Sequence, residues 1–199
     1  MSDKRQAKKE ALRTRLLEVT TEQMRQNGIE DLRARDIAKE AGCAVGSLYT
    51  TFEDLDDLIL HINSNTLQSL GAALALGQQE IDEPAARMEK LACDYLDFAL
   101  QNYRLWRAVF DHKWPEEKPV PNWHLDNQHQ LFLKIAIPLK ELLPDADEEL
   151  LLLEARTLFA AIHGIITLSL EERYAAVQKS ILKQQIIKFT KLIIAGLRA

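Results

Sequence analysis

Four side-chain hydroxyls fall within five consecutive residues of this sequence, at Ser47, Tyr49, Thr50 and Thr51. They belong to the stretch AGCAVGSLYTTF, residues 41–52, which contains no charged side chain. A hydroxyl group donates and accepts hydrogen bonds without carrying charge, and small neighbouring residues allow another molecule to approach the backbone closely. The pattern indicates a surface that binds a polar partner through hydrogen bonds.

Other combinations of reactive residues do not have the spacing that catalysis or metal binding needs. His112, His124 and His129 lie in or beside one proline-rich segment, but no two are three or four residues apart, the spacing that places two ligands on one helix face. Cys43 and Cys93 give neither a disulfide framework nor a zinc spacing. The sequence has no nucleophile elbow, phosphate-binding glycine loop or HExxH motif. We therefore expect no enzyme activity, no metal and no cofactor.

The 199 residues are 47% hydrophobic, which is enough for one large domain or two small ones. Residues 1–53 contain ten Lys or Arg and nine Asp or Glu, whereas residues 54–199 contain fifteen and twenty-one. Residues 1–15 alone contain six Lys or Arg and two acids, and this basic end on an acidic body favours a polyanionic partner or a solvated helix end. The N-terminus lacks the apolar stretch of a signal peptide, and the apolar run TLFAAIHGIITLSL is expected to be too short to span a bilayer. We expect a cytoplasmic protein with no membrane contact.

Helical periodicity dominates, and no segment shows the alternation of a strand or an Asn-Gly or Asp-Gly hairpin turn. The sequence therefore predicts an all-α fold of about nine helices. Their approximate ranges are 4–27, 34–40, 45–51, 54–76, 83–103, 104–110, 122–143, 147–173 and 176–197. Gly28 and Gly42 are expected to end the first two helices, and Asp54 to cap the fourth with Asp57 as its partner.

Two short helices around Gly42 predict a helix-turn-helix. Ile37, Ala38, Leu48 and Phe52 fall on its inward side. The outward residues are Ala44, Val45, Gly46, Ser47, Tyr49, Thr50 and Thr51. Because a recognition helix enters the major groove by its N-terminal end, we expect Ser47 and the methyl groups of Ala44 and Val45 to contact bases.

Phosphate contacts are expected from the outward hydroxyls and from two arginines. Hydroxyl and backbone N–H groups supply many of the phosphate contacts in protein–DNA complexes, which suits Tyr49, Thr50 and Thr51. Arg33 and Arg35, near the start of the preceding helix, add positive charge beside the flanking DNA backbone.

The stretch RARDIAKEAGCAVGSLYTTFEDLDDLI, residues 33–59, resembles the DNA-binding signature of the TetR/AcrR family of transcriptional regulators. The resemblance implies a helix-turn-helix domain over residues 1–53 and a helical effector-binding and dimerisation domain over residues 54–199. It also implies a double-stranded operator as partner. The family commonly has a lysine at the start of the fourth helix, where this chain has Leu55 among four acids.

The last two predicted helices are apolar around much of their circumference, which predicts a homodimer through both of them. Burial of both helices inside a single bundle is the alternative. Aromatic residues also gather in residues 54–199 and suit a hydrophobic or aromatic effector. The candidate effector-binding residues are Trp106, Phe110, Trp123, Phe159 and His163. The segment FAAIHGIITL, with Phe159, His163 and Gly164, is similar to the tryptophan-histidine-glycine signature of one subfamily of these regulators. Packing in the protein core is the alternative role for these side chains.

Three functions remain open at this level. The first is a ligand-responsive transcriptional regulator. It would be a repressor that binds a palindromic operator and leaves it when a small, largely apolar effector binds. The second is a helix-turn-helix protein that binds DNA without a small effector. The third is an all-helical enzyme or ligand carrier whose DNA-binding part has decayed.

Overall fold

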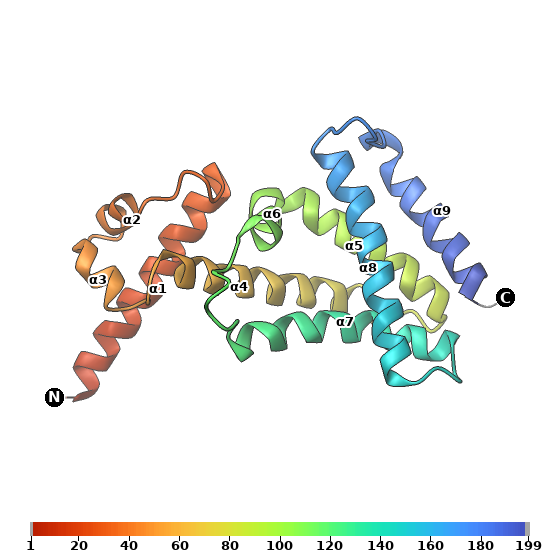
Figure 1. Cartoon of the computed structure of the whole chain (residues 1–199), viewed down its shortest axis with the longest axis horizontal. Helices are drawn as coiled ribbons and strands as arrows, with labels where there is room; N and C mark the ends of the chain where they lie inside the picture. Colours follow the sequence, from red (N-terminus) through yellow and green to blue (C-terminus); the bar gives the residue numbers. More distant parts are fainter. Residues whose placement is uncertain (1, 198–199) are drawn as a thin grey trace. The chain divides into compact units, whose positions relative to one another are not determined.

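The computed structural model describes residues 2–197, and these residues form nine helices and no strand. The helices are α1 (Ser2–Asn27), α2 (Ala34–Glu40), α3 (Val45–Tyr49), α4 (Leu55–Leu76), α5 (Pro84–Gln101), α6 (Tyr103–Asp111), α7 (Asn122–Leu142), α8 (Glu148–Leu170) and α9 (Lys179–Leu197) (Figure 1). The all-α prediction is confirmed, and each predicted helix is present in this part of the chain.

Local signals end the first helices where they were expected. Gly28 and Gly42 have φ angles of 82° and 71°, a conformation that glycine adopts without steric cost. Asp54 precedes α4, and its carboxylate accepts a hydrogen bond of 2.8 Å from the backbone N–H of Asp57.

The largest difference from the predicted ends lies between α8 and α9. The sequence predicted helices as far as residue 173 and again from residue 176, but residues 171–178 form a turn. The Ser169 hydroxyl accepts a hydrogen bond of 3.2 Å from the N–H of Val177, and Glu172 adopts a φ of 54°. This hydrogen bond joins residues eight positions apart and stabilises the turn. As a result α9 begins later than the sequence predicted.

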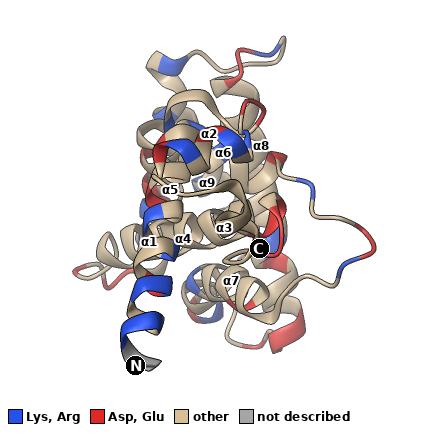
Figure 2. Cartoon of the chain, turned by 90° about the vertical axis from the view of Figure 1, so that its left-hand side faces the viewer, with Lys and Arg blue, Asp and Glu red and all other residues tan. Residues whose placement is uncertain are grey.

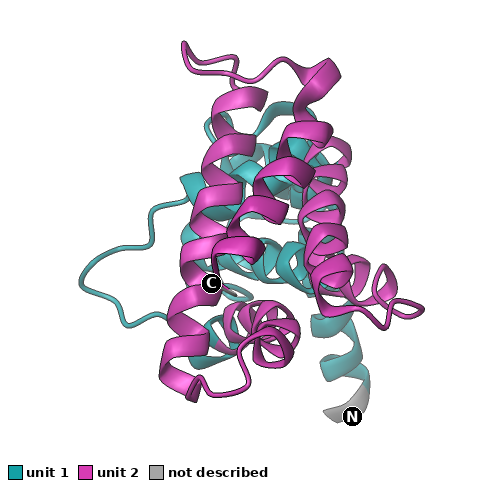
Figure 3. Cartoon of the chain, turned by 90° about the vertical axis from the view of Figure 1, so that its right-hand side faces the viewer, with its two compact units in different colours: residues 1–68, 102–125 teal, residues 69–101, 126–199 magenta. Residues whose placement is uncertain are grey.

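The chain divides into two compact units (Figure 3). Unit 1 contains residues 1–68 and 102–125, and unit 2 contains residues 69–101 and 126–199. The predicted functional division between residues 53 and 54 is a different boundary and stays a prediction.

Unit 1 has an apolar core to which α6 contributes as well as the first four helices. Its buried members are Leu16, Val19, Met24, Leu32, Ile37, Leu48, Phe52, Leu58, Ile59, Ile62, Leu105 and Ala108. Leu105 and Ala108 belong to α6, which packs against α1. The predicted helix-turn-helix therefore rests on a core that includes residues some fifty positions further along the chain.

In unit 2, α5 packs against α8 and α9, and α8 packs against α9. Ile166 on α8 and Leu182 and Ile186 on α9 are among the fully buried side chains of this unit. Lys183 of α9 binds Asp97 of α5 at 2.7 Å, at the exposed edge of the same contact.

Among the described residues, α8 is the one helix long and apolar enough to cross a membrane by length and composition. The expectation that this run is too short was wrong, because the helix has 23 residues and begins before the apolar stretch. Only 28% of its most apolar 18-residue window is buried within the chain. Leu153 and Leu168, for example, are 57% and 42% exposed.

The two glycines of the predicted helix-turn-helix give a matched pair for a stability measurement. Gly42→Ala should lower the free energy of unfolding by about 1–2 kcal/mol, because alanine must adopt a left-handed conformation there. Gly46→Ala should raise it by up to about 1 kcal/mol, since alanine is the better helix former. An added Cβ meets no atom within 4 Å at either position, so backbone conformation alone separates the two variants. Urea unfolding measures both, and equal effects would contradict this assignment.

Candidate functional site

The turn between α2 and α3 fixes the predicted helix-turn-helix. The N–H of Cys43 donates to the carbonyl of Ala38 at 2.9 Å, and the N–H of Gly42 donates to that of Lys39 at 3.2 Å. These two hydrogen bonds are those of a Schellman motif, which ends a helix at a left-handed residue. The motif sets the direction in which α3 leaves α2.

The inward and outward sides of α3 lie as the sequence predicts. Leu48 is fully buried and Phe52 is 2% exposed, whereas Tyr49 is 50% exposed. Ala44, Gly46 and Thr50 are also exposed, and Val45, Ser47 and Thr51 are partly exposed. The structure thus gathers all seven outward residues on one short segment, and their contact with DNA stays a prediction.

Two of the outward hydroxyls are engaged within the chain. The hydroxyl groups of Thr50 and Thr51 donate to the carbonyl of Ser47 at 2.9 and 2.8 Å. A phosphate oxygen is an acceptor, so either threonine must turn its proton away from Ser47 before it can donate to a phosphate.

The two arginines lie at the start of α2, Arg33 directly before the helix and Arg35 within its first turn, and both are exposed. Arg33 precedes the helix, and one nitrogen of its guanidinium donates to the carbonyls of Glu30 and Leu32 at 2.9 and 2.8 Å. These bonds hold Arg33 close to the backbone, while the other guanidinium nitrogens still carry N–H groups for a partner.

Lys118, which lies in the loop between α6 and α7, was not predicted from the sequence as a functional residue. Its ammonium group binds the carboxylates of Glu53 and Asp54, at 2.8 and 2.5 Å, directly after the helix-turn-helix. Hydrogen bonding to Asp54 and Glu53 raises the pKa of Lys118, and the same bond lowers the pKa of Asp54. The sequence signals in this region are the proline-rich loop and the cluster of acids after the helix-turn-helix. Neither signal indicates that a lysine of the loop binds those acids.

Three of the predicted effector-binding residues lie in unit 1. Trp106 is buried and packs edge-to-face against Phe110, with 5.7 Å between ring centroids. Trp123 stacks on His61 with the rings 4.4 Å apart and nearly parallel. Burial and the nearby Arg13 guanidinium lower the pKa of His61, whereas Asp57 acts in the opposite direction.

The other two predicted effector-binding residues lie together in unit 2. Phe159 stacks on His163 with ring centroids 5.4 Å apart. The Tyr95 hydroxyl and Nδ1 of His163 are 2.8 Å apart, and the Thr167 hydroxyl lies 3.2 Å from Nε2. Both ring nitrogens therefore have partners within the chain, and burial lowers the pKa of His163. An effector role for these five residues stays a prediction.

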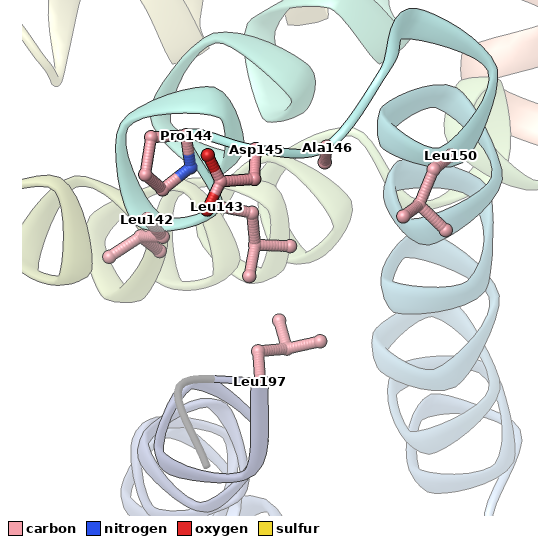
Figure 4. Close-up of a pocket in the computed structure, with 7 residues that line it drawn as sticks. All are labelled: Leu142, Leu143, Pro144, Asp145, Ala146, Leu150 and Leu197. Atoms are coloured by element: carbon pink, nitrogen blue, oxygen red, sulfur yellow. The ribbon is translucent and has the colours of Figure 1, made fainter.

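A cavity of about 470 Å³ lies elsewhere in unit 2, where α7 ends and α8 begins (Figure 4). Its described lining residues are Leu142, Leu143, Pro144, Asp145, Ala146, Leu150 and Leu197. None of the predicted effector-binding residues is among them. Over the described part of the chain, no group of three or more His, Cys, Asp or Glu side chains could hold a metal ion.

This arrangement defines a helix-turn-helix protein with a second, helical part. The family model "Bacterial regulatory proteins, tetR family" matches residues 16–62, and the model "Tetracyclin repressor-like, C-terminal domain" matches residues 88–185. The chain belongs to the TetR family of DNA-binding transcription regulators. The resemblance to the tryptophan-histidine-glycine subfamily stays a prediction.

Solved structures share the fold at low sequence identity. A protein of unknown function from Rhodococcus sp. RHA1 has a TM-score of 0.77 at 22% identity, covering 94% of this chain and 96% of its own. RolR in complex with resorcinol has a TM-score of 0.68 at 19% identity, with coverages of 96% and 93%. PfmR, a TetR-family regulator from Thermus thermophilus, has a TM-score of 0.63 at 16% identity, with coverages of 92% and 99%. No curated protein matches the sequence.

The burial of His163 predicts a pH dependence of stability. Its pKa is lowered in the folded protein, while the unfolded chain takes up a proton near the ordinary value of about 6.5. The free energy of unfolding should therefore fall as the pH decreases through about 6.5 towards the lower pKa of the folded state. His163→Gln should make this decrease smaller between about pH 7 and 5.

Urea unfolding at several pH values measures the effect. His129→Gln, at an exposed position on α7, controls for the loss of one histidine from the sequence. An unchanged pH dependence in His163→Gln would contradict the prediction.

Proposed function

We propose that the protein is a transcriptional repressor in the cytoplasm, which a small and largely apolar effector releases from a palindromic operator. The observation that carries the DNA-binding part is the outward side of α3, held in place by the buried Leu48 and Phe52. On this proposal α3 enters the major groove by its N-terminal end.

Each outward residue has a role in the proposed complex. Ser47 hydrogen-bonds a base edge, and the methyl groups of Ala44 and Val45 contact thymine methyl groups. Gly46 lets the α3 backbone approach the DNA. The proposed phosphate contacts come from the other residues of the set, namely Tyr49, Thr50, Thr51, Arg33 and Arg35.

The first turns of α1 extend the positive charge of the same unit. Lys4, Arg5, Lys8 and Lys9 are all exposed there, and Figure 2 shows these blue segments near the start of the helix. Counterion release from such groups would add affinity that depends on salt rather than on sequence.

The proposed homodimer forms through α8 and α9. In support, Leu153 and Leu192 are 57% and 63% exposed on these helices in the single chain. An isologous contact would bury this apolar surface and present two recognition helices to half-sites roughly 34 Å apart, or a multiple of that distance.

The proposed effector binds aromatic side chains, with Trp106, Phe110, Trp123, Phe159 and His163 as the candidates. The complex of RolR with resorcinol supports an aromatic compound, because that protein shares the fold. An effector acts by binding one dimer geometry better than the other, and it shifts the equilibrium only by that difference in affinity.

Two substitutions on α3 test the DNA-binding proposal. Tyr49→Phe should weaken binding to all duplexes alike, because it removes a phosphate contact. Ser47→Ala should instead relax the choice at one base pair, by about 1–3 kcal/mol at most. Fluorescence anisotropy on a panel of duplexes at several salt concentrations measures both effects. If the wild-type protein shows no salt-dependent DNA binding, the proposed function is wrong. A changed preference among duplex sequences in Tyr49→Phe would contradict the phosphate-contact role of that residue.

Calorimetric titration of a candidate effector tests the switch. Saturating operator DNA should weaken effector binding by the same factor by which the effector weakens DNA binding, about 5- to 150-fold. Phe159→Ala should reduce effector affinity and leave operator affinity nearly unchanged. Equal effector affinity with and without operator, for every compound that binds, would favour a DNA-binding protein without a small effector.

A further inference from the structure

Four carboxylates follow the helix-turn-helix within five residues, at Glu53, Asp54, Asp56 and Asp57. On the proposed function they lie next to a DNA backbone, which repels them. Two of them cap the start of α4 through hydrogen bonds. The Asp54 carboxylate accepts from the N–H of Asp57 at 2.8 Å, and the Asp57 carboxylate accepts from the N–H of Glu53 at 3.1 Å. The helix start therefore uses acids as its capping residues in a place where the proposed partner disfavours them.

Three basic residues outside the cluster contact these carboxylates, two from the region after α6 and one from α4 itself. Lys118 contacts Glu53 and Asp54. Nε2 of His112 lies 3.0 Å from Asp56, and Nε2 of His61 lies 3.6 Å from Asp57. Of these three partners, Lys118 carries a full positive charge at neutral pH, so it is the strongest source of neutralisation.

The loop between α6 and α7 holds Lys118 in this position. The indole N–H of Trp114 donates to the carbonyl of Lys118 at 3.0 Å, and the Lys118 ammonium lies 5.9 Å from the centre of the Trp114 ring. The same loop also contains Lys113, Glu116 and Glu117, so it carries both signs of charge (Figure 2). Its two lysines and two glutamates balance in charge, so the position of Lys118, rather than the net charge of the loop, reduces the negative charge of Glu53 and Asp54.

We propose that Lys118 is a positioning residue for DNA binding, which neutralises Glu53 and Asp54 so that an acid-capped α4 can lie beside a DNA backbone. The inference rests on the proposed function. On this proposal Lys118 acts through the two carboxylates, which engage its ammonium group within unit 1, rather than through a phosphate contact of its own.

The test measures binding to a random-sequence duplex of about 30 base pairs at ~50 mM and ~200 mM salt. Lys118→Glu should weaken binding by on the order of tenfold at the lower salt and by less at the higher salt. Lys113→Glu is the matched control, since it changes the net charge equally from an exposed position in the same loop. We expect a clearly smaller loss for the control.

The charge swap Glu53→Lys with Lys118→Glu separates neutralisation from a direct contact. It keeps two acids and one cation in the group formed by positions 53, 54 and 118, so it should restore binding to near the wild-type level. If the swap binds as weakly as Lys118→Glu alone, Lys118 contacts DNA itself and the inference is wrong. Equal losses for the variants at 113 and 118 would also overturn it, because net charge would then be sufficient.

Folding is checked by circular dichroism and thermal unfolding of every variant. Lys118→Gln, which removes the charge without adding a carboxylate, replaces Lys118→Glu if the latter does not fold. A structural role alone would give a loss that persists at ~200 mM salt, and that result would contradict the proposal. If the wild-type protein itself does not bind the duplex at low salt, the proposed function fails, which is a separate outcome.

Discussion

The burial of Leu48 is the constraint on which the rest of unit 1 depends. A helix as short as α3, with five residues, does not form stably in isolation. It exists here because the fully buried Leu48 side chain joins a core with Leu16, Phe52 and Leu58. Once this side chain points inward, the directions of Ser47 and Tyr49 follow from helix geometry alone. The outward surface is therefore a consequence of core packing.

Features encoded within a few residues could be predicted from the sequence. Gly42 ends α2 because the turn needs a left-handed residue, and Asp54 caps α4 through a neighbour three positions away. The alternation of buried and exposed positions around Leu48 is equally local. The turn after α8 was not predicted, because it depends on a hydrogen bond between Ser169 and Val177, which are eight positions apart.

Contacts between distant segments could not be predicted in this way. Nothing near Glu53 in the sequence indicates that Lys118 binds it from 65 positions away, and nothing near His61 indicates the stacked ring of Trp123. These pairs form because α6 packs in the core of unit 1 and returns the chain to the start of α4. The predicted effector-binding residues were likewise grouped because they all follow residue 53 in the sequence, whereas the fold divides them between the two units.

This division of aromatic residues has a spectroscopic consequence. The chain has three tryptophans, Trp106, Trp114 and Trp123, and all three belong to unit 1. Trp106 is buried, Trp114 donates to the backbone of its own loop, and Trp123 lies against a histidine ring. Emission excited selectively from tryptophan therefore originates in the unit that contains the helix-turn-helix. Unit 2 contributes no such emission, so intrinsic fluorescence observes one half of this protein without any attached label.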